Sequence, residues 1–292
     1  MLAGLSIALL SPAGQLVEKK LEVVASFYPI SDFTQHVSKD RAEILNLVSG
    51  EPHEWEPTPK DIERIAKADL FIYNGADLDD KWVSEVLKAI GQQEKPIVIK
   101  ATAGAPVHPI SAETGGAGMD PHLWLDPQLV RDFYVPNILE GLRKADPEAR
   151  AAFEANSEAF QSRLSQLDAA IRDGLKDCRL QTLIISHRFM SYFAERYQLQ
   201  VESICGLEPC DPSPGRLAQL TKLARELGIQ FVFAESGEGR KIVEPLAGEI
   251  GAQVLILNPL EFLMDEDLKA GKDYLSVMEE NVKVLRLGLE CK

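Results

Sequence analysis

The sequence has few of the residues that most often carry chemistry, with four cysteines and five histidines among 292 residues. It contains no Cys-x-x-Cys pair and no His-Glu-x-x-His run, so neither a zinc ribbon, a thioredoxin-like motif nor a metalloprotease helix is indicated. No apolar run reaches the roughly 20 residues of a membrane span. Basic residues are in the minority, and the net charge of -14 disfavours binding to nucleic acid or to an anionic membrane.

The first residues, "MLAGLSIALL", form a short apolar run that resembles the core of a secretory signal without its basic start. We therefore expect residues 1 to 20 to be a leader and the protein to be periplasmic. The alternative is an apolar tail with no targeting role. No cysteine follows the run, so a lipid-anchored N-terminus is not indicated.

The four cysteines are an even number, which in an exported protein is compatible with two disulfides. Cys205 and Cys210 are close enough in sequence to close a small loop, and Cys291 could then hold the C-terminus to Cys178. The alternative is four free thiols in a reducing cytoplasm.

The alternation of elements predicts an α/β fold with two lobes, each a parallel-rich sheet with helices, joined by one long rigid helix. The N-terminal lobe is expected to cover residues 21 to 145, the linking helix 146 to 176 and the C-terminal lobe 177 to 292. In the first lobe, Thr58 and Pro59 are typical of a helix start. Strands are expected at residues 21 to 30, 42 to 50, 70 to 75 and 96 to 100, with helices at 31 to 40, 58 to 69 and 81 to 91.

The predicted linking helix is rich in Ala, Glu, Gln, Arg and Leu and has a single apolar stripe. Asp146 can cap it, and its length would be roughly 40 Å. The stripe consists of Phe153, Phe160, Leu164, Leu167 and Ile171. In the second lobe, strands are expected at residues 181 to 186, 200 to 206, 230 to 236 and 253 to 258, with helices at 189 to 198, 212 to 228, 239 to 251 and 273 to 289.

One histidine lies in an unusually constrained stretch, "GMDPHLWLDPQ", at residues 118 to 128. Each proline fixes its own φ and biases the preceding residue towards extended backbone. We therefore expect a stiff turn, anchored by Trp124, that aims His122 at a ligand.

His53, His122 and His187 are each expected in a loop that follows a strand or closes a lobe. Ligands of open parallel sheets bind outside the carboxyl ends of the strands, so the three imidazoles could meet between the lobes. A histidine taken alone is more often structural, but three imidazoles together suit Zn²⁺, with Cu, Ni and Mn as competitors. His36 and His108 are not expected to be ligands, beyond a transient contact of His108 with metal.

A fourth ligand would complete a tetrahedron. Glu261 is the first candidate, Glu235 the second and a water molecule the third, because a carboxylate also cancels one positive charge in the cleft. Asn258 is a weak ligand for zinc.

Seven motifs resemble the metal-binding lipoprotein and zinc-uptake group (cluster A-I) of ABC-transporter substrate-binding proteins. They are "ASFYPISDF", "GEPHEWEPTPKDI", "ADLFIYNGADLDDKW", "MDPHLWLDP", "ISHRFMSYFAERY", "PSPGRLAQL" and "LNPLEFL" with "GKDYLSVMEENVKVL". They cover nearly the whole chain after residue 20, in the order found in that family.

The resemblance implies that His53, His122 and His187 are metal ligands. Manganese-type members have a carboxylate in the third position, so His187 favours zinc over Mn²⁺. Many members have an aspartate where this chain has Asn258, and some zinc-binding members have a glutamate in an Asn-Pro-Leu-Glu run, which matches Glu261. Zinc-type members often carry a long His-rich loop, but residues 103 to 118 hold only His108, so a metal-collecting role is not expected there.

The resulting hypothesis is a monomeric, non-enzymatic protein that captures zinc and delivers it to the membrane permease of an ABC transporter. One rival is a zinc hydrolase that uses the same three histidines, with a water as fourth ligand and Glu235 or Glu54 as general base. Another is an adhesin in which the metal is only structural.

Overall fold

The computed structural model describes residues 20–91, 94–110, 118–206, 210, 212–236 and 239–292. The expected leader, except for Lys20, lies outside these residues, as does part of the stretch from 103 to 118.

The protein is built on two four-stranded sheets in which all paired strands are parallel, so the predicted α/β fold with two sheets is confirmed. The order of the first sheet is β2-β1-β3-β4 and that of the second is β6-β5-β7-β8. Apolar, β-branched runs form the central strands, as expected for strands that are covered on both faces. The strands are β1 (Leu21–Phe27), β2 (Ala42–Val48), β3 (Leu70–Tyr73), β4 (Ile97–Lys100), β5 (Thr182–Ile185), β6 (Gln200–Ser203), β7 (Phe231–Glu235) and β8 (Gln253–Leu257).

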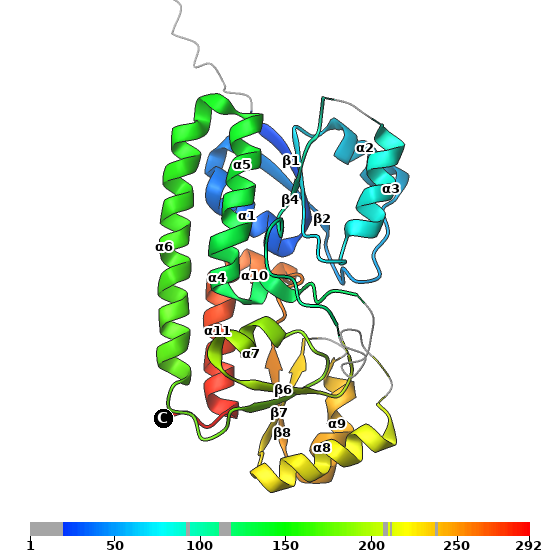
Figure 1. Cartoon of the computed structure of the whole chain (residues 1–292), viewed down its shortest axis with the longest axis vertical. Helices are drawn as coiled ribbons and strands as arrows, with labels where there is room; N and C mark the ends of the chain where they lie inside the picture. The colour runs from blue at the N-terminus through cyan, green and yellow to red at the C-terminus, as the bar shows by residue number, and fades with distance from the viewer. Residues whose placement is uncertain (1–19, 92–93, 111–117, 207–209, 211, 237–238) are drawn as a thin grey trace, which may run out of the picture.

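Helices connect the strands and cover the sheets (Figure 1). Those of the N-terminal half are α1 (Tyr28–Ser38), η1 (Lys39–Arg41), α2 (Pro59–Lys67), α3 (Asp80–Ile90), η3 (His122–Leu125), α4 (Pro127–Leu129), η4 (Val130–Tyr134), α5 (Val135–Ala145) and η5 (Pro147–Ala149). Those of the second half are α6 (Arg150–Leu175), α7 (Ser191–Tyr197), α8 (Pro214–Leu227), α9 (Gly239–Ile250), α10 (Asp265–Lys269) and α11 (Tyr274–Gly288).

The predicted long helix is α6, which runs along one side of the molecule past both sheets (Figure 1). Its apolar stripe is buried, and it packs against α1 and α5 of the first half and against α11 of the second. The C-terminal helix α11 also contacts α1. Two long helices therefore hold the halves together beside the sheets.

Two local expectations were wrong. The first strand ends at Phe27 instead of residue 30, because α1 already begins at Tyr28, with Pro29 in its first turn and Phe27 as the N-cap. The helix expected at residues 31 to 40 therefore begins three residues earlier, with Ser31 inside it. The helix α5, which was not predicted, begins beside Pro136 and continues a stretch of π-helix.

Other local expectations were confirmed. Thr58 caps α2 in a capping box with Asp61, and Asp146 accepts a hydrogen bond from the backbone of Ala149 at the start of the long helical segment. The disulfides join Cys178 to Cys291 and Cys205 to Cys210, as predicted. Within the described ranges, no helix is both long and apolar enough to span a bilayer.

Candidate metal centre

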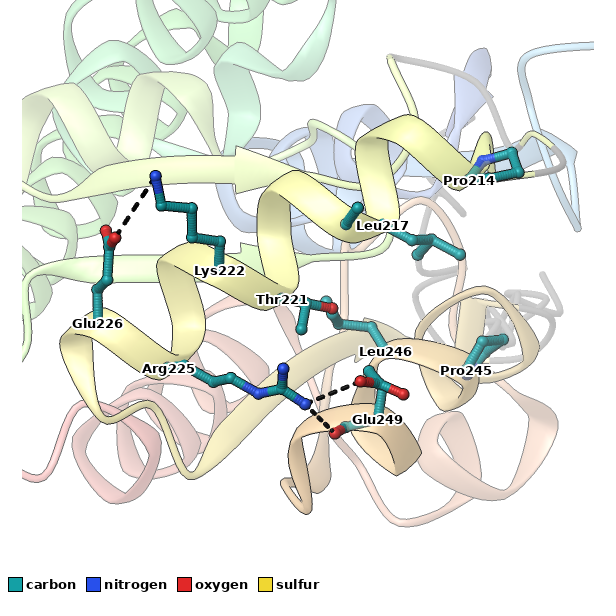
Figure 2. A pocket seen from close by; sticks show the side chains of 10 residues that line it. Pro214, Leu217, Thr221, Lys222, Arg225, Glu226, Pro245, Leu246 and Glu249 are labelled. Carbon is teal, nitrogen blue, oxygen red and sulfur yellow. Dashed lines mark hydrogen bonds and ion pairs between the residues drawn. The ribbon is translucent and has the colours of Figure 1, made fainter.

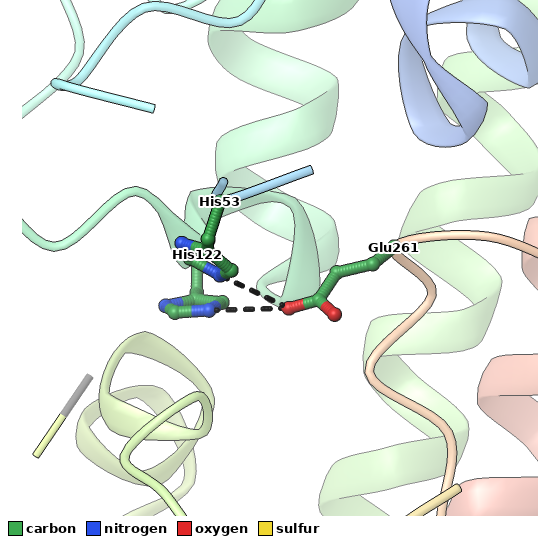
Figure 3. Close-up of side chains that lie close together, drawn as sticks. All are labelled: His53, His122 and Glu261. Atoms are coloured by element: carbon green, nitrogen blue, oxygen red, sulfur yellow. Dashed lines mark hydrogen bonds and ion pairs between the residues drawn. The ribbon is translucent and has the colours of Figure 1, made fainter. Parts of the chain in front are cut away.

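Three of the predicted ligands meet at one point (Figure 3). His53 lies in the loop after β2, His122 opens η3, and Glu261 lies in the loop after β8. Nε2 of His53 is 3.3 Å from Oε1 of Glu261, and Nε2 of His122 is 3.5 Å from the same oxygen. One ligand atom from each residue lies within 4.8 Å of the others.

The three side chains differ in how far solvent reaches them. The exposed fraction of the side chain is 0% for His122, 1% for Glu261 and 13% for His53. A hydrated ion would therefore meet His53 first and reach His122 and Glu261 last.

Asp120 fixes the orientation of His122. Its Oδ1 is 2.8 Å from Nδ1 of the imidazole and also accepts the backbone N–H of His122 at 3.0 Å. The ring therefore donates from Nδ1, which leaves Nε2 directed at Glu261. This is the carboxylate–histidine arrangement that commonly supports a metal-bound imidazole.

The charges of the centre depend on one another. Burial opposes a charge on His122, but the neighbouring carboxylates Asp120 and Glu261 outweigh it and raise the pKa of this imidazole to about 9. Burial alone would raise the pKa of Glu261, yet the imidazoles of His122 and His53 beside it lower it well below its usual range. The two carboxylates therefore favour the protonated form of the His122 imidazole.

The loop that carries Glu261 is held by backbone and amide hydrogen bonds. Asn281 of α11 accepts from the backbone N–H of Asn258 at 2.9 Å and donates to its carbonyl oxygen at 2.7 Å. The side-chain oxygen of Asn258 in turn accepts the backbone N–H of Leu260 at 2.8 Å. Asn258 therefore shapes the loop, in agreement with its low rank as a ligand.

His187, the third predicted histidine, lies beside the group but is not part of it. Its ring centre is 5.7 Å from that of His122, and its side chain is 2% exposed. Nδ1 lies 3.0 Å from Oε1 of Glu235 but is not aligned for a hydrogen bond, and Nε2 is also without a hydrogen-bond partner. Glu235, the second candidate for the fourth ligand, thus contacts His187 instead of the other three residues.

The two remaining histidines are held by other contacts. The His36 ring stacks on Phe160 at 4.2 Å between ring centres, with Asp32 and Asp273 each 3.5 Å from its Nε2. His108 stacks on Tyr192 and has a side chain that is 39% exposed. Neither belongs to the metal-ligating group found among the described residues.

Two residues near the centre were missed as functional candidates in the sequence. Asp120 was noted only as part of an Asp-Pro element, although an aspartate two residues before a histidine across a proline can fold back onto the ring. Glu51 accepts the backbone N–H of His53 at 3.0 Å, and its carboxylate lies 3.9 Å from Nε2 of that histidine. Its side chain is 49% exposed, and burial together with the Glu261 carboxylate raises its pKa.

A separate hollow of about 720 Å³ lies between α8 and α9 (Figure 2). Its charged residues pair with each other: Nη2 of Arg225 is 2.8 Å from Oε1 of Glu249, and Lys222 lies 3.8 Å from Glu226. No histidine or cysteine is among the described residues that line it. Among the described residues, no group of three metal-ligating side chains is found at this hollow.

The donor set of the centre suits a borderline dication. Imidazole nitrogen suits Zn²⁺ and other transition metals, and a carboxylate oxygen is the usual anionic addition. Nε2 of His122 and Nε2 of His187 are buried and lack hydrogen-bond partners. Buried polar atoms are normally satisfied, so these nitrogens are free to accept a metal ion.

Known proteins resemble the chain over nearly its full length. It is 35% identical to the high-affinity zinc uptake system protein ZnuA of Bacillus subtilis, over 94% of this chain and 89% of the relative. It is 34% identical to the zinc-binding lipoprotein AdcA of Streptococcus pneumoniae. That match covers 91% of this chain but only 55% of the relative.

The crystal structure of the Zn(II)-bound ZnuA-like domain of that AdcA superposes with a TM-score of 0.80 at 34% identity, covering 93% of this chain and 100% of the domain. The family model described as zinc-uptake complex component A, periplasmic, matches residues 23–288. The resemblance seen in the motifs is thereby confirmed, and the chain belongs to the ZnuA family of zinc-uptake components.

Proposed function

We propose that the chain binds one zinc ion with His53, His122, His187 and Glu261 and delivers it to the membrane permease of an ABC transporter. The observation that carries this proposal is the spacing of the donor atoms. Two donors about 2.0 to 2.1 Å from a tetrahedral zinc lie about 3.3 to 3.4 Å apart. The distances from the two histidine nitrogens to Glu261 are 3.3 and 3.5 Å.

His187 is the fourth ligand in this proposal. Its ring is next to that of His122, and Nε2 is buried without a hydrogen bond. Oε1 of Glu235 lies 3.0 Å from Nδ1 of the ring, close enough to support it as carboxylates commonly support zinc-bound histidines once the two groups align. Three neutral imidazoles and one carboxylate prefer zinc to manganese, which favours oxygen-rich sites.

The proposed activity is capture and release without catalysis. Four protein ligands leave no coordination position for a substrate, which a catalytic zinc requires. Of the two bases that a hydrolase could use, Glu54 is exposed and Glu235 lies against His187. The adhesin is not favoured either. The large exposed apolar side chains of the described residues are methionine, leucine and isoleucine, so they form no aromatic patch that could contact a partner.

The setting of this function is also part of the proposal. We propose a monomer in the periplasm, with residues 1 to 20 as its leader and a permease as its partner. Residues 21 to 145 and 177 to 292 are proposed to form the lobes, with residues 146 to 176 linking them. A continuous helix offers few places for a hinge, so metal loading should move loops more than lobes.

The test is a zinc titration of protein freed of metal with a chelator. We expect one zinc per chain in the wild type, read by competition with a chromophoric chelator. His122→Ala should lose stoichiometric binding, whereas His108→Ala, a matched change at an exposed histidine, should retain it. Equal binding by both variants would refute the site, and turnover of model esters that depends on zinc would favour the hydrolase.

A further inference from the structure

The two halves of the molecule are joined beside the metal centre by a hydrogen bond that involves no proposed ligand. The indole Nε1–H of Trp124 donates to the carbonyl oxygen of Pro259 at 2.8 Å, across 135 positions of sequence. Trp124 comes two residues after His122, and Pro259 comes two residues before Glu261. The bond thus links the turn that carries one proposed ligand to the loop that carries another.

A second hydrogen bond also holds the turn. The hydroxyl of Tyr274, the first residue of α11, donates to the carbonyl oxygen of Trp124 at 2.8 Å. Both side chains are fully buried, and each ring packs edge-on against a phenylalanine of the first half. Those contacts join Trp124 to Phe27 and Tyr274 to Phe33, both at 4.9 Å between ring centres.

The backbone of the Glu261 loop needs such support. Leu260 has a φ of 62°, in the left-handed region that residues with a side chain seldom adopt. A backbone of this kind persists where the surroundings fix it. Asn281 fixes one end of the loop at Asn258, and Trp124 fixes the next residue, Pro259.

We propose that Trp124 is a positioning residue for the metal: with Tyr274 it forms a clamp that holds Glu261 in register with His122. This inference rests on the proposed function and adds to it a division of the ligands. The clamp acts on the backbone that carries His122 and on the loop that carries Glu261, and neither of its two hydrogen bonds involves His53 or His187. The two halves are thus joined beside the centre by hydrogen bonds between protein groups alone.

The test uses Trp124→Phe, which keeps an aromatic ring in the core and removes the donor. Trp82→Phe is the matched control, because Trp82 is buried in the separate cluster around Phe71 and Val83. Tyr274→Phe removes the second bond of the clamp. For each protein, zinc affinity is measured by chelator competition, the visible absorption of the Co²⁺ form reports coordination geometry, and the zinc-free form is melted.

We expect Trp124→Phe to bind zinc more weakly than Trp82→Phe, by no more than the roughly 10- to 100-fold that follows the loss of a direct partner of a metal ligand. Its Co²⁺ band should weaken as a carboxylate ligand is replaced by water, while the zinc-free form still melts cooperatively. Tyr274→Phe should change affinity and spectrum in the same direction by a smaller factor. A loss of stability alone would not change the Co²⁺ spectrum of the folded protein.

The inference is overturned if Trp124→Phe matches Trp82→Phe within twofold in affinity and keeps the wild-type Co²⁺ band. If Trp124→Phe does not fold, Tyr274→Phe decides by the same two readouts. Wild-type protein that bound neither metal would refute the proposed function itself. Wild-type binding with unaffected clamp variants would refute this inference alone.

Discussion

Oδ1 of Asp120 lies 2.8 Å from Nδ1 of His122 and accepts the backbone N–H of the same residue at 3.0 Å. One carboxylate oxygen thus fixes both the backbone turn and the ring that it carries. Because Nδ1 is occupied by this contact, Nε2 is the nitrogen presented to Glu261. The negative charge of Asp120 also makes the imidazole more basic, which strengthens it as a ligand.

Replacing Asp120 with asparagine should therefore weaken zinc binding while the turn is retained. The amide oxygen can still accept both hydrogen bonds, but the charge is gone, and we expect affinity to fall about 10- to 100-fold. Chelator competition measures the effect. Asp132→Asn is the control, because that aspartate pairs with Arg131 at the surface. Equal affinity in the two variants would show that Asp120 has only a structural role.

Zinc binding should release a proton at neutral pH. Against the effect of burial, Asp120 and Glu261 raise the pKa of His122 to about 9, so the ring is protonated at pH 7.5 in the metal-free protein. A metal ligand must be neutral, so the ion displaces that proton. Calorimetric titrations in two buffers of different ionisation enthalpy should give about one proton released per zinc. From pH 9 down to 7, affinity should fall by about tenfold per pH unit. Heats that do not depend on the buffer would contradict this.

The metal-free protein should lose stability in the same pH range. The pKa of His122 in the folded state is above the value of about 6.5 for an unperturbed histidine. Its contribution to stability is therefore fully present below about pH 6.5 and is lost as the pH rises through 9. Melting temperatures of the metal-free protein should decline over this window, and His122→Asn should show a smaller decline. A flat profile in the wild type would argue against a proton stored on this ring.

The periodic features of the sequence allowed the fold to be predicted. Apolar strands alternating with capped helices indicate parallel sheets, and the stripe from Phe153 to Ile171 indicates the long helix. The start of α1 was misplaced because Pro29 fits both an extended strand end and a helix start. In that case, local propensity alone does not choose between the two.

The sequence indicated three residues that the structure brings together, but not the residues that hold them in place. Histidines after strand ends point to one edge of a parallel sheet, which is why His53 and His122 could be brought together with Glu261. The bond from Trp124 to Pro259 joins residues 135 positions apart, and no local pattern reveals such a partner. The contact between Glu235 and His187 was also missed. Both residues could have been ligands, and no local pattern shows that they contact each other.

The two disulfides should contribute differently, because one is hydrogen-bonded to the neighbour of a proposed ligand and the other closes a long loop. Cys205 follows β6, and its backbone N–H donates to the carbonyl oxygen of Ser186, the neighbour of His187. Replacing Cys205 and Cys210 by alanine should loosen this loop and weaken zinc binding by a few fold, with a modest loss of stability because the closed loop is short. Chelator competition would detect the change, and unaltered affinity would show that the bridge does not support His187.

Replacing Cys178 and Cys291 by alanine should lower the stability of the protein strongly and change its zinc affinity little. This bridge joins the segment after α6 to the C-terminus and closes a loop with a sequence separation of 113 residues. Opening so long a loop frees much of the unfolded chain and should lower the free energy of unfolding by about 4 to 5 kcal/mol in the chain-entropy model. Denaturant unfolding of the metal-free protein measures this loss. Zinc affinity of the folded variant should stay within twofold of the wild type, because none of the proposed ligands contacts the bridge. A large drop in affinity with little loss of stability would reverse the roles assigned to the two bridges.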